Sequence, residues 1–136
     1  DCKFKIIRED ETLEIGSVKV TAVPAYNINK FRMGKIPFHA QGEGFGYIIK
    51  MNGVKVYHAG DTDFIPEMKK VKADIALLPI GGTYTMDAKE AAEAANAIKP
   101  KIVIPMHYNT IKDTMTDAEG FAKLIHKDIK VVINPQ

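Results

Sequence analysis

The first half of the chain carries the apolar and β-branched residues typical of strands. Between Val18 and Val23 apolar residues alternate with Lys and Thr, a pattern typical of a strand that buries one face. The segment Phe4–Arg8 has a similar composition. Phe45–Met51 and Val54–His58 flank Asn52-Gly53, whose two positions tolerate the positive φ of a tight hairpin turn. We therefore expect four strands, the last two joined as a hairpin.

The second half changes to short apolar runs separated by a helical segment. Asp74–Pro79 and Ile102–Met106 are apolar enough to be buried strands. Ala88–Lys99 is rich in Ala, and Pro100 follows it. Asp87 and Glu90 have the spacing of an N-cap and its capping-box partner. This pattern predicts a helix between two strands.

The last segment repeats this order. Thr116 and Glu119 have a second capping-box spacing, which predicts a helix ending near His126, and Val131–Ile133 predicts a final strand. Strands that alternate with helices pair in parallel through right-handed crossovers. The fold class is therefore α/β (α+β), with a mixed sheet. The long segment from residue 24 to residue 44 has few strand or helix signals, and loops of that length are often functional.

Composition excludes several classes of protein. The chain has 136 residues, 46% of them hydrophobic, with 19 Lys and Arg against 17 Asp and Glu. This apolar content excludes disorder, and the single cysteine excludes a disulfide scaffold and fits a cytoplasmic protein. No apolar run approaches the roughly 20 residues of a membrane span. The net charge of +2 gives no support for binding to nucleic acid.

Three residues that could bind a metal stand beside predicted strands. Asp61 follows the strand that ends at His58, His107 follows the strand Ile102–Met106, and His39 precedes the strand that begins near Phe45. Ligands bind beyond the carboxyl ends of strands in open α/β sheets, and carboxylate and imidazole bind divalent metals. Taken singly, an aspartate such as Asp61 is more often a turn residue or helix cap, and a lone histidine is more often a hydrogen-bonded surface or core residue. His58 alternates in phase with Val54 and Val56, so we expect it to face the core.

Three segments together resemble the metallo-β-lactamase superfamily of metal-dependent hydrolases. They are YHAGDTD (57–63), LLPIGGTYTM (77–86) and IPMHY (104–108). The chain is most similar to a branch of small hydrolases that includes the ascorbate-phosphate lactonases. The resemblance implies an αββα sandwich whose two metal ions, usually zinc and sometimes manganese or iron, share a bridging aspartate. It assigns Asp61 as that bridge and catalytic residue, and His107 as a ligand of the second metal.

The resemblance also implies the reaction and the substrate pocket. A hydroxide activated by the two metals would attack an ester, lactone, amide or phosphodiester of a small molecule. Where the family has a further histidine ligand this chain has Asn27, and His39 is the natural substitute, since imidazole binds zinc better than an amide oxygen. Asn27 and His39 both stay candidates for the third ligand. The candidates for the substrate pocket are Asn27, Thr62, Tyr84, Thr85 and Tyr108.

The family's His-x-His-x-Asp-His motif is not in this sequence, which begins at Asp1 rather than Met. We therefore expect residues 1–136 to be a single incomplete domain, the C-terminal two-thirds of the fold, with helices on one face of the sheet. Such a fragment would be inactive alone. Its uncovered sheet face would bind either the missing N-terminal segment or a second copy in a homodimer. The alternative function is a non-enzymatic interaction domain that keeps the fold.

Overall fold

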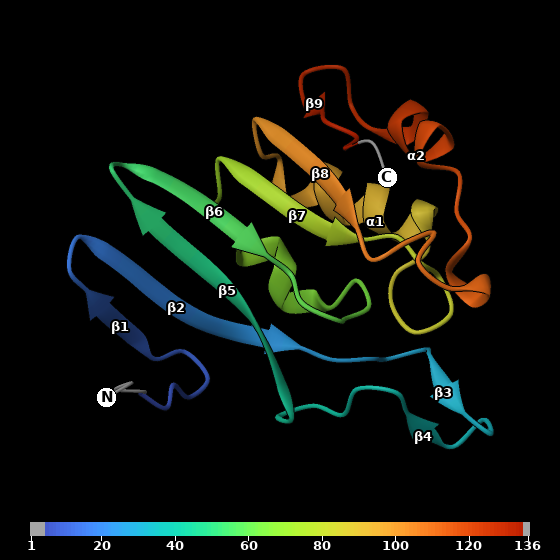
Figure 1. Ribbon diagram of the computed structural model, residues 1–136, viewed down its shortest axis with the longest axis horizontal. Coiled ribbons are helices and arrows are strands. Elements are labelled where there is room, and N and C mark those ends of the chain that lie inside the picture. Colours follow the sequence, from blue (N-terminus) through green and yellow to red (C-terminus); the bar gives the residue numbers. More distant parts are fainter. Residues whose placement is uncertain (1–4, 135–136) are drawn as a thin grey trace.

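The computed structural model describes residues 5–134. A seven-stranded mixed sheet dominates the fold, in the order β1-β2-β5-β6-β7-β8-β9, while β3 and β4 form a separate hairpin (Figure 1). The strands are β1 (Thr12–Ile15), β2 (Val18–Ala25), β3 (Phe31–Arg32), β4 (Ile36–Pro37), β5 (Gly44–Met51), β6 (Val54–His58), β7 (Ile75–Pro79), β8 (Ile102–Met106) and β9 (Lys130–Val131). The helices are α1 (Ala88–Ile98) and α2 (Ala118–Leu124), with 3-10 turns η1 (Pro66–Lys70) and η2 (Lys112–Thr114).

The sheet changes from antiparallel to parallel at β6. The pairs β1–β2, β2–β5 and β5–β6 are antiparallel, and β6–β7, β7–β8 and β8–β9 are parallel. Asn52 and Gly53 both have positive φ, at 49° and 82°, and join β5 to β6. The predicted hairpin and the predicted parallel pairing are therefore confirmed, as is the mixed α/β class.

The helices lie on one face of the sheet, behind it in the view of Figure 1. Alternate residues of the central strands, among them Tyr57, Leu78 and Val103, are buried against this layer. Helix α1 contributes a row of buried small residues, Ala91, Ala92, Ala94 and Ala95, followed by Ile98. Small side chains let the helix approach the sheet closely, and one hydrophobic core results.

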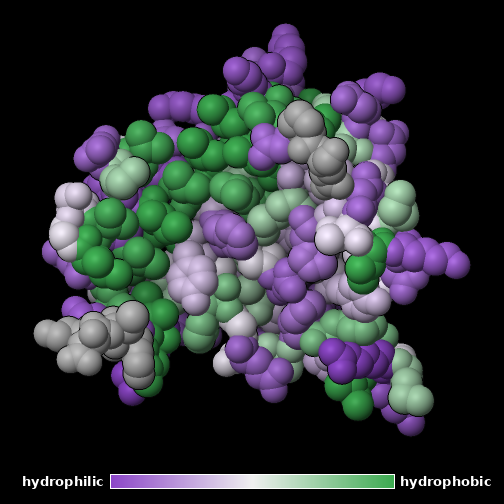
Figure 2. Space-filling view, in the orientation of Figure 1, coloured by the Kyte–Doolittle hydropathy of each residue, from purple (hydrophilic) through white to green (hydrophobic). Residues whose placement is uncertain are grey.

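The opposite face of the sheet has no helix over it in residues 5–134. Ile75, Leu77, Ile102 and Ile104 point to this face and stay half-exposed. The register carries the row across β6 and β5 to Val20 of β2 and the neighbouring strand β1. Figure 2 shows these hydrophobic side chains as a broad apolar surface. We call this surface the open face.

The first predicted strand differs from the structure. Residues 5–8 of the expected strand Phe4–Arg8 are not a strand, and Phe4 itself lies outside the described residues. The edge strand is instead β1, whose Thr12 pairs with Thr21. Local composition cannot distinguish the two segments because pairing with β2 decides which one is a strand. The structure also adds η1, which begins at Pro66 and was not predicted.

The ends of the later elements are corrected as well. The capping box of α1 is confirmed, with Asp87 accepting from the backbone of Glu90 and the Glu90 side chain accepting from the backbone of Asp87. The second predicted box is wrong, because the hydroxyl of Thr116 donates to the carbonyl of Ile80 and α2 begins after Asp117. Helix α2 ends at Leu124, and β9 is Lys130–Val131 rather than Val131–Ile133.

The prediction for His58 is also wrong. Tyr57, not His58, is the buried residue of β6, and the alternating set Val54, Val56 and His58 faces the open face. The alternation was correctly identified, but the sequence does not say which face of a sheet a helix covers. Separately, no helix within residues 5–134 has the length and apolar character needed to cross a membrane.

Candidate metal centre

Three loops at one edge of the sheet bring Asp61, His39 and His107 together. Asp61 and His107 follow β6 and β8, whose carboxyl ends reach the same edge because both strands run parallel to β7. His39 comes from the segment between β4 and β5, which passes this edge in Figure 1. The predicted ligand residues, which are 22 or more positions apart in sequence, are therefore neighbours in space.

The two imidazoles face opposite oxygens of one carboxylate. Nε2 of His39 lies 3.4 Å from Oδ2 of Asp61, and Nε2 of His107 lies 3.5 Å from its Oδ1. Two donors bound to one tetrahedral zinc at ~2.0–2.1 Å are about 3.3 Å apart. Each histidine is thus at the distance at which it and Asp61 could share an ion, and the carboxylate could bridge two of them.

The backbone conformation of two loops positions the Asp61 carboxylate and the His107 imidazole. Gly60 has φ of 71°, and a Cβ there would lie 2.9 Å from the carbonyl oxygen of Phe45, so the turn before Asp61 requires glycine. His107 also has positive φ, 55°. A Cβ on Gly81 would lie 2.5 Å from the carbonyl oxygen of His107. The backbone around each of these two candidate ligands therefore has a glycine where no Cβ fits.

Asn27 is not placed as a ligand. Its side chain is buried, and its oxygen accepts from the backbone N–H of His39 at 2.7 Å and lies 3.0 Å from His39 Nδ1. Its amide nitrogen donates to Asp63 and to the carbonyl of Tyr84, each at 3.0 Å. Both polar atoms of the Asn27 side chain are therefore engaged by protein groups, which favours His39 as the third candidate ligand.

A pocket of 380 Å³ opens over the three candidate ligands. Phe38 and Tyr84 form one wall, with ring centroids 4.8 Å apart and ring planes nearly perpendicular. The guanidinium of Arg32 lies 5.2 Å from the centre of the Phe38 ring, within the range of a cation–π contact. The full lining is Arg32, Phe38, His39, Asp61, Tyr84, His107 and Ile111. Arg32, Phe38 and Ile111 were not predicted, since no motif marks them.

The other pocket candidates lie beneath the surface. Thr62, Thr85 and Tyr108 are buried and do not line this pocket. The hydroxyl of Thr62 accepts from the backbone N–H of Tyr26 at 3.1 Å. The hydroxyl of Thr85 has no hydrogen-bond partner among the described residues. Of the predicted pocket residues, Tyr84 alone has its side chain at this opening.

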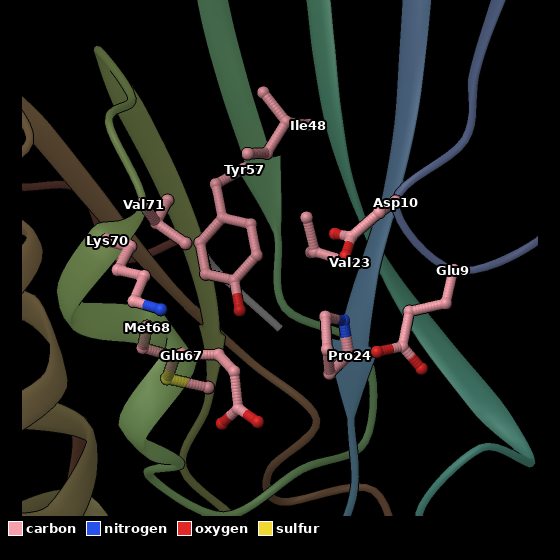
Figure 3. A pocket seen from close by; sticks show the side chains of 10 residues that line it. All are labelled: Glu9, Asp10, Val23, Pro24, Ile48, Tyr57, Glu67, Met68, Lys70 and Val71. Atoms are coloured by element: carbon pink, nitrogen blue, oxygen red, sulfur yellow. The ribbon is translucent and has the colours of Figure 1, made fainter.

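A second pocket, of 220 Å³, lies on the helix side of the sheet (Figure 3). Tyr57 forms part of its wall, and burial raises the pKa of the Tyr57 hydroxyl. The lining is Glu9, Asp10, Val23, Pro24, Ile48, Tyr57, Glu67, Met68, Lys70 and Val71. It includes none of the predicted ligands, so it is separate from the candidate metal centre.

The candidate centre is an incomplete ligand set. Within residues 5–134 no group of three or more His, Cys, Asp and Glu side chains is arranged so that it could hold a metal ion by itself. The three side chains nevertheless fit part of a metal site, because two imidazole nitrogens approach the same carboxylate from its two oxygens. Further ligands would have to come from water or from other polypeptide.

Comparison with known proteins defines the class. The Beta-lactamase superfamily domain matches residues 2–107 of this chain, and the chain belongs to this superfamily. The structure superposes on that of a Parabacteroides distasonis protein with a TM-score of 0.82 and 40% identity, covering 97% of this chain and 58% of the other. Igni18, a metallo hydrolase from Ignicoccus hospitalis, gives a TM-score of 0.72 at 30% identity, covering 93% and 55%.

Sequence relatives share the name of a single group within this class. A UPF0173 metal-dependent hydrolase from Thermococcus onnurineus is 42% identical over 125 residues, covering 88% of this chain and 54% of that protein. A second, from Thermoplasma acidophilum, is 43% identical over 129 residues, covering 92% and 55%. The chain therefore spans about half the length of the curated relatives it matches.

Proposed function

We propose that this chain supplies one part of the active site of a metal-dependent hydrolase. The observation that carries the proposal is the placement of His39 and His107 on opposite oxygens of Asp61. In this proposal Asp61, His39 and His107 would hold divalent metal, zinc being the first choice and manganese or iron the alternatives. Bound ions of this kind lower the pKa of water and stabilise developing negative charge.

The residues of the chain itself define how a substrate would be held. The Phe38 and Tyr84 rings exclude water from one side of the pocket, and Arg32 places a positive charge at its wall. Asp61 would orient the attacking group toward a small ester, lactone, amide or phosphodiester. The pocket volume of 380 Å³ is within the range of small-molecule sites.

Metal content and turnover test the proposal. The 136-residue chain is mixed with Zn²⁺ or Mn²⁺, dialysed, and its metal measured together with hydrolysis of a phosphodiester and a lactone. We expect one weakly bound ion and no turnover, because three ligands leave a second ion short of imidazoles. Two tightly bound ions with turnover would contradict the proposal that this chain supplies only part of the active site. No binding at all would contradict the proposal that Asp61, His39 and His107 bind metal.

We also propose that the open face is covered in the working protein, either by further polypeptide or by a second copy. An apolar surface of this extent is unusual on a monomer. Light scattering measures the mass of the chain in solution and so tests whether it forms a dimer through the open face. Ile104→Lys, in strand β8 of the open face, should then reduce the measured mass. Met33→Lys is the matched control, because Met33 is 96% exposed on the β3–β4 hairpin.

A further inference from the structure

The side chain of Asn27 can have only one orientation. Its nitrogen lies 3.0 Å from Oδ1 of Asp63 and 3.0 Å from the carbonyl oxygen of Tyr84, and both of these oxygens only accept hydrogen bonds. The nitrogen must therefore be the donating NH₂ group. This places the Asn27 oxygen toward His39, where it accepts from the backbone N–H of that residue at 2.7 Å.

This orientation determines which nitrogen of His39 carries the proton. Nδ1 of His39 lies 3.0 Å from the Asn27 oxygen, which can only accept. Nδ1 is therefore the donor, and in the neutral imidazole Nε2 has a free lone pair. The Nε2 atom lies 3.4 Å from Oδ2 of Asp61. Two acceptors held this close are stabilised when a cation lies between them.

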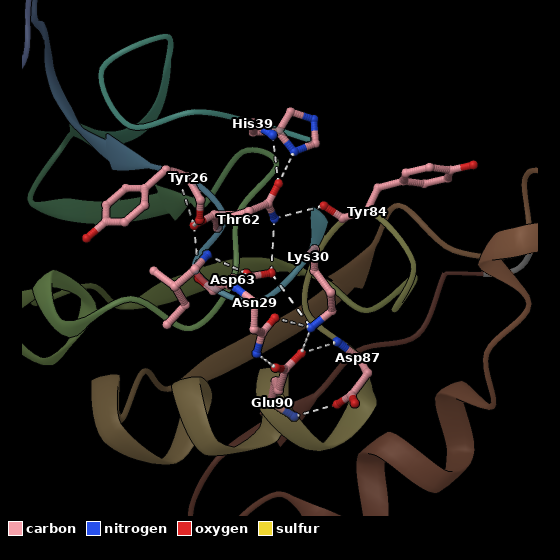
Figure 4. Close-up of polar contacts among 11 residues, drawn as sticks. Tyr26, Asn29, Lys30, His39, Thr62, Asp63, Tyr84, Asp87 and Glu90 are labelled. Atoms are coloured by element: carbon pink, nitrogen blue, oxygen red, sulfur yellow. Dashed lines mark hydrogen bonds and ion pairs between the residues drawn. The ribbon is translucent and has the colours of Figure 1, made fainter. Parts of the chain in front are cut away.

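The carboxylate of Asp63 fixes the orientation of the Asn27 side chain. The Asp63 side chain is fully buried and accepts from the backbone N–H groups of Ile28 at 2.7 Å and Asn29 at 2.9 Å, besides the amide of Asn27 (Figure 4). Nζ of Lys30 lies 3.8 Å from Asp63 and 2.6 Å from Glu90 of α1. The network therefore connects the first turn of α1 to the imidazole of His39.

We propose that Asn27 is a positioning residue, which holds His39 in the Nδ1–H tautomer and, braced by Asp63, directs Nε2 at the metal site. The proposal deepens the proposed function and rests on it for the presence of a metal. Outer hydrogen-bond partners of this kind set the tautomer and orientation of metal-binding imidazoles. Here the Asn27 amide, which is hydrogen-bonded to the buried carboxylate of Asp63, is the outer partner of His39.

The tautomer is measured directly, without metal. The ¹⁵N-labelled 136-residue chain is treated with a chelator at about pH 8, where ordinary imidazoles are neutral, and its histidine rings are examined by two-bond ¹H–¹⁵N correlation. We expect His39 in the Nδ1–H form. Asn27→Ala should convert it toward the Nε2–H form. Asn29→Ala is the matched control, since it removes an amide two residues away that contacts Glu90 and Lys30 rather than His39.

Three results would overturn the proposal. The first is an Nε2–H tautomer of His39 in the unsubstituted chain, a measurement that needs no variant to fold. The second is a tautomer unchanged by Asn27→Ala in a chain whose backbone amide spectrum stays folded. The third is an unchanged Nδ1–H population in Asp63→Asn, since this substitution allows the Asn27 amide to rotate and should lower that population.

Metal affinity separates this proposal from the proposed function. Titration calorimetry with Zn²⁺ should show about 10–100-fold weaker binding by Asn27→Ala, the usual effect of losing an outer hydrogen-bond partner, and unchanged binding by Asn29→Ala. If the unsubstituted chain binds no Zn²⁺ while His39 is in the Nδ1–H form, the proposed function fails and the positioning stands. If Zn²⁺ binds to the unsubstituted chain and binds Asn27→Ala as tightly as Asn29→Ala, the positioning proposal fails and the proposed function stands.

Discussion

Nε2 of His107 lies 3.5 Å from Oδ1 of Asp61, although the two residues belong to loops that follow different strands. The parallel pairing of β6 with β7 and of β7 with β8 brings these loops to one edge of the sheet. The contact therefore follows from the topology rather than from local sequence. Four further experiments test the consequences of the structure.

Removal of His107 should weaken metal binding severely. His107→Ala takes away an imidazole that faces Asp61, so the affinity for Zn²⁺ should fall by more than the about 10–100-fold that an outer partner costs. His126→Ala is the control, because His126 is exposed and pairs with Asp128 away from the centre. Calorimetry on both variants gives the comparison, and equal losses would remove His107 from the ligand set.

Two buried threonines should respond oppositely to replacement by valine. Both are 0% exposed, but the Thr85 hydroxyl has no partner within residues 5–134, whereas the Thr62 hydroxyl accepts from the Tyr26 backbone N–H. Thr85→Val should stabilise the chain by about 1 kcal/mol, and Thr62→Val should destabilise it by about 1–3 kcal/mol. Urea unfolding measures both free energies. A loss of stability in Thr85→Val would show that its hydroxyl has a partner.

The two N-cap aspartates should also differ. The side chain of Asp87 accepts the backbone N–H of Glu90 at 2.8 Å, whereas Asp117 makes no capping bond to α2. Asp87→Ala should therefore lower the free energy of unfolding by about 1 kcal/mol. Asp117→Ala should have a smaller effect, also measured in urea. Equal effects would mean that the cap of α1 contributes nothing beyond its charge.

Acid should destabilise the chain through Glu90. Burial raises the pKa of Glu90, but hydrogen bonds from Lys30, Asn29 and the Asp87 backbone outweigh it and hold the pKa below the usual value. A lowered pKa stabilises the fold above the unfolded-state value of about 4.3, and this contribution disappears as the pH falls through the folded-state pKa. Thermal unfolding between about pH 6 and pH 3 measures it.

Two variants isolate this effect. Glu90→Gln should flatten the fall in stability below about pH 4.3, because the titrating group is gone. Lys30→Met should flatten it as well, since Nζ of Lys30 is 2.6 Å from Glu90. An unchanged pH slope in both variants would place the acid sensitivity elsewhere.

Several elements could be predicted because their signals are local. The Asn52-Gly53 hairpin and the Asp87 cap of α1 depend on residues within a few positions of one another. The Thr116 box failed because the Thr116 hydroxyl donates instead to Ile80, which is distant in sequence. Likewise β1 is defined by its partner strand rather than by its own composition.

The candidate ligands show the same division. Asp61 and His107 stand in motifs and could be proposed as candidates from sequence, and ligand chemistry alone favoured His39 over Asn27. The hydrogen bonds of Asn27 to Asp63 and Tyr84 support that preference, since they engage the Asn27 amide and leave its oxygen for His39. The wall residues Arg32 and Phe38 likewise enter the pocket only through the path of the β3–β4 hairpin.

By itself the sequence therefore determined the mixed α/β class of fold, the Asn52-Gly53 turn and the Asp87 cap, which follow from periodicity and short-range spacing. The candidates Asp61 and His107 came from the resemblance of their motifs to a family. The tertiary structure alone decided which face of the sheet is covered, which threonine hydroxyl has a partner and which nitrogen of His39 faces Asp61. The physical reason is that burial and hydrogen bonding depend on groups that only chain topology brings together.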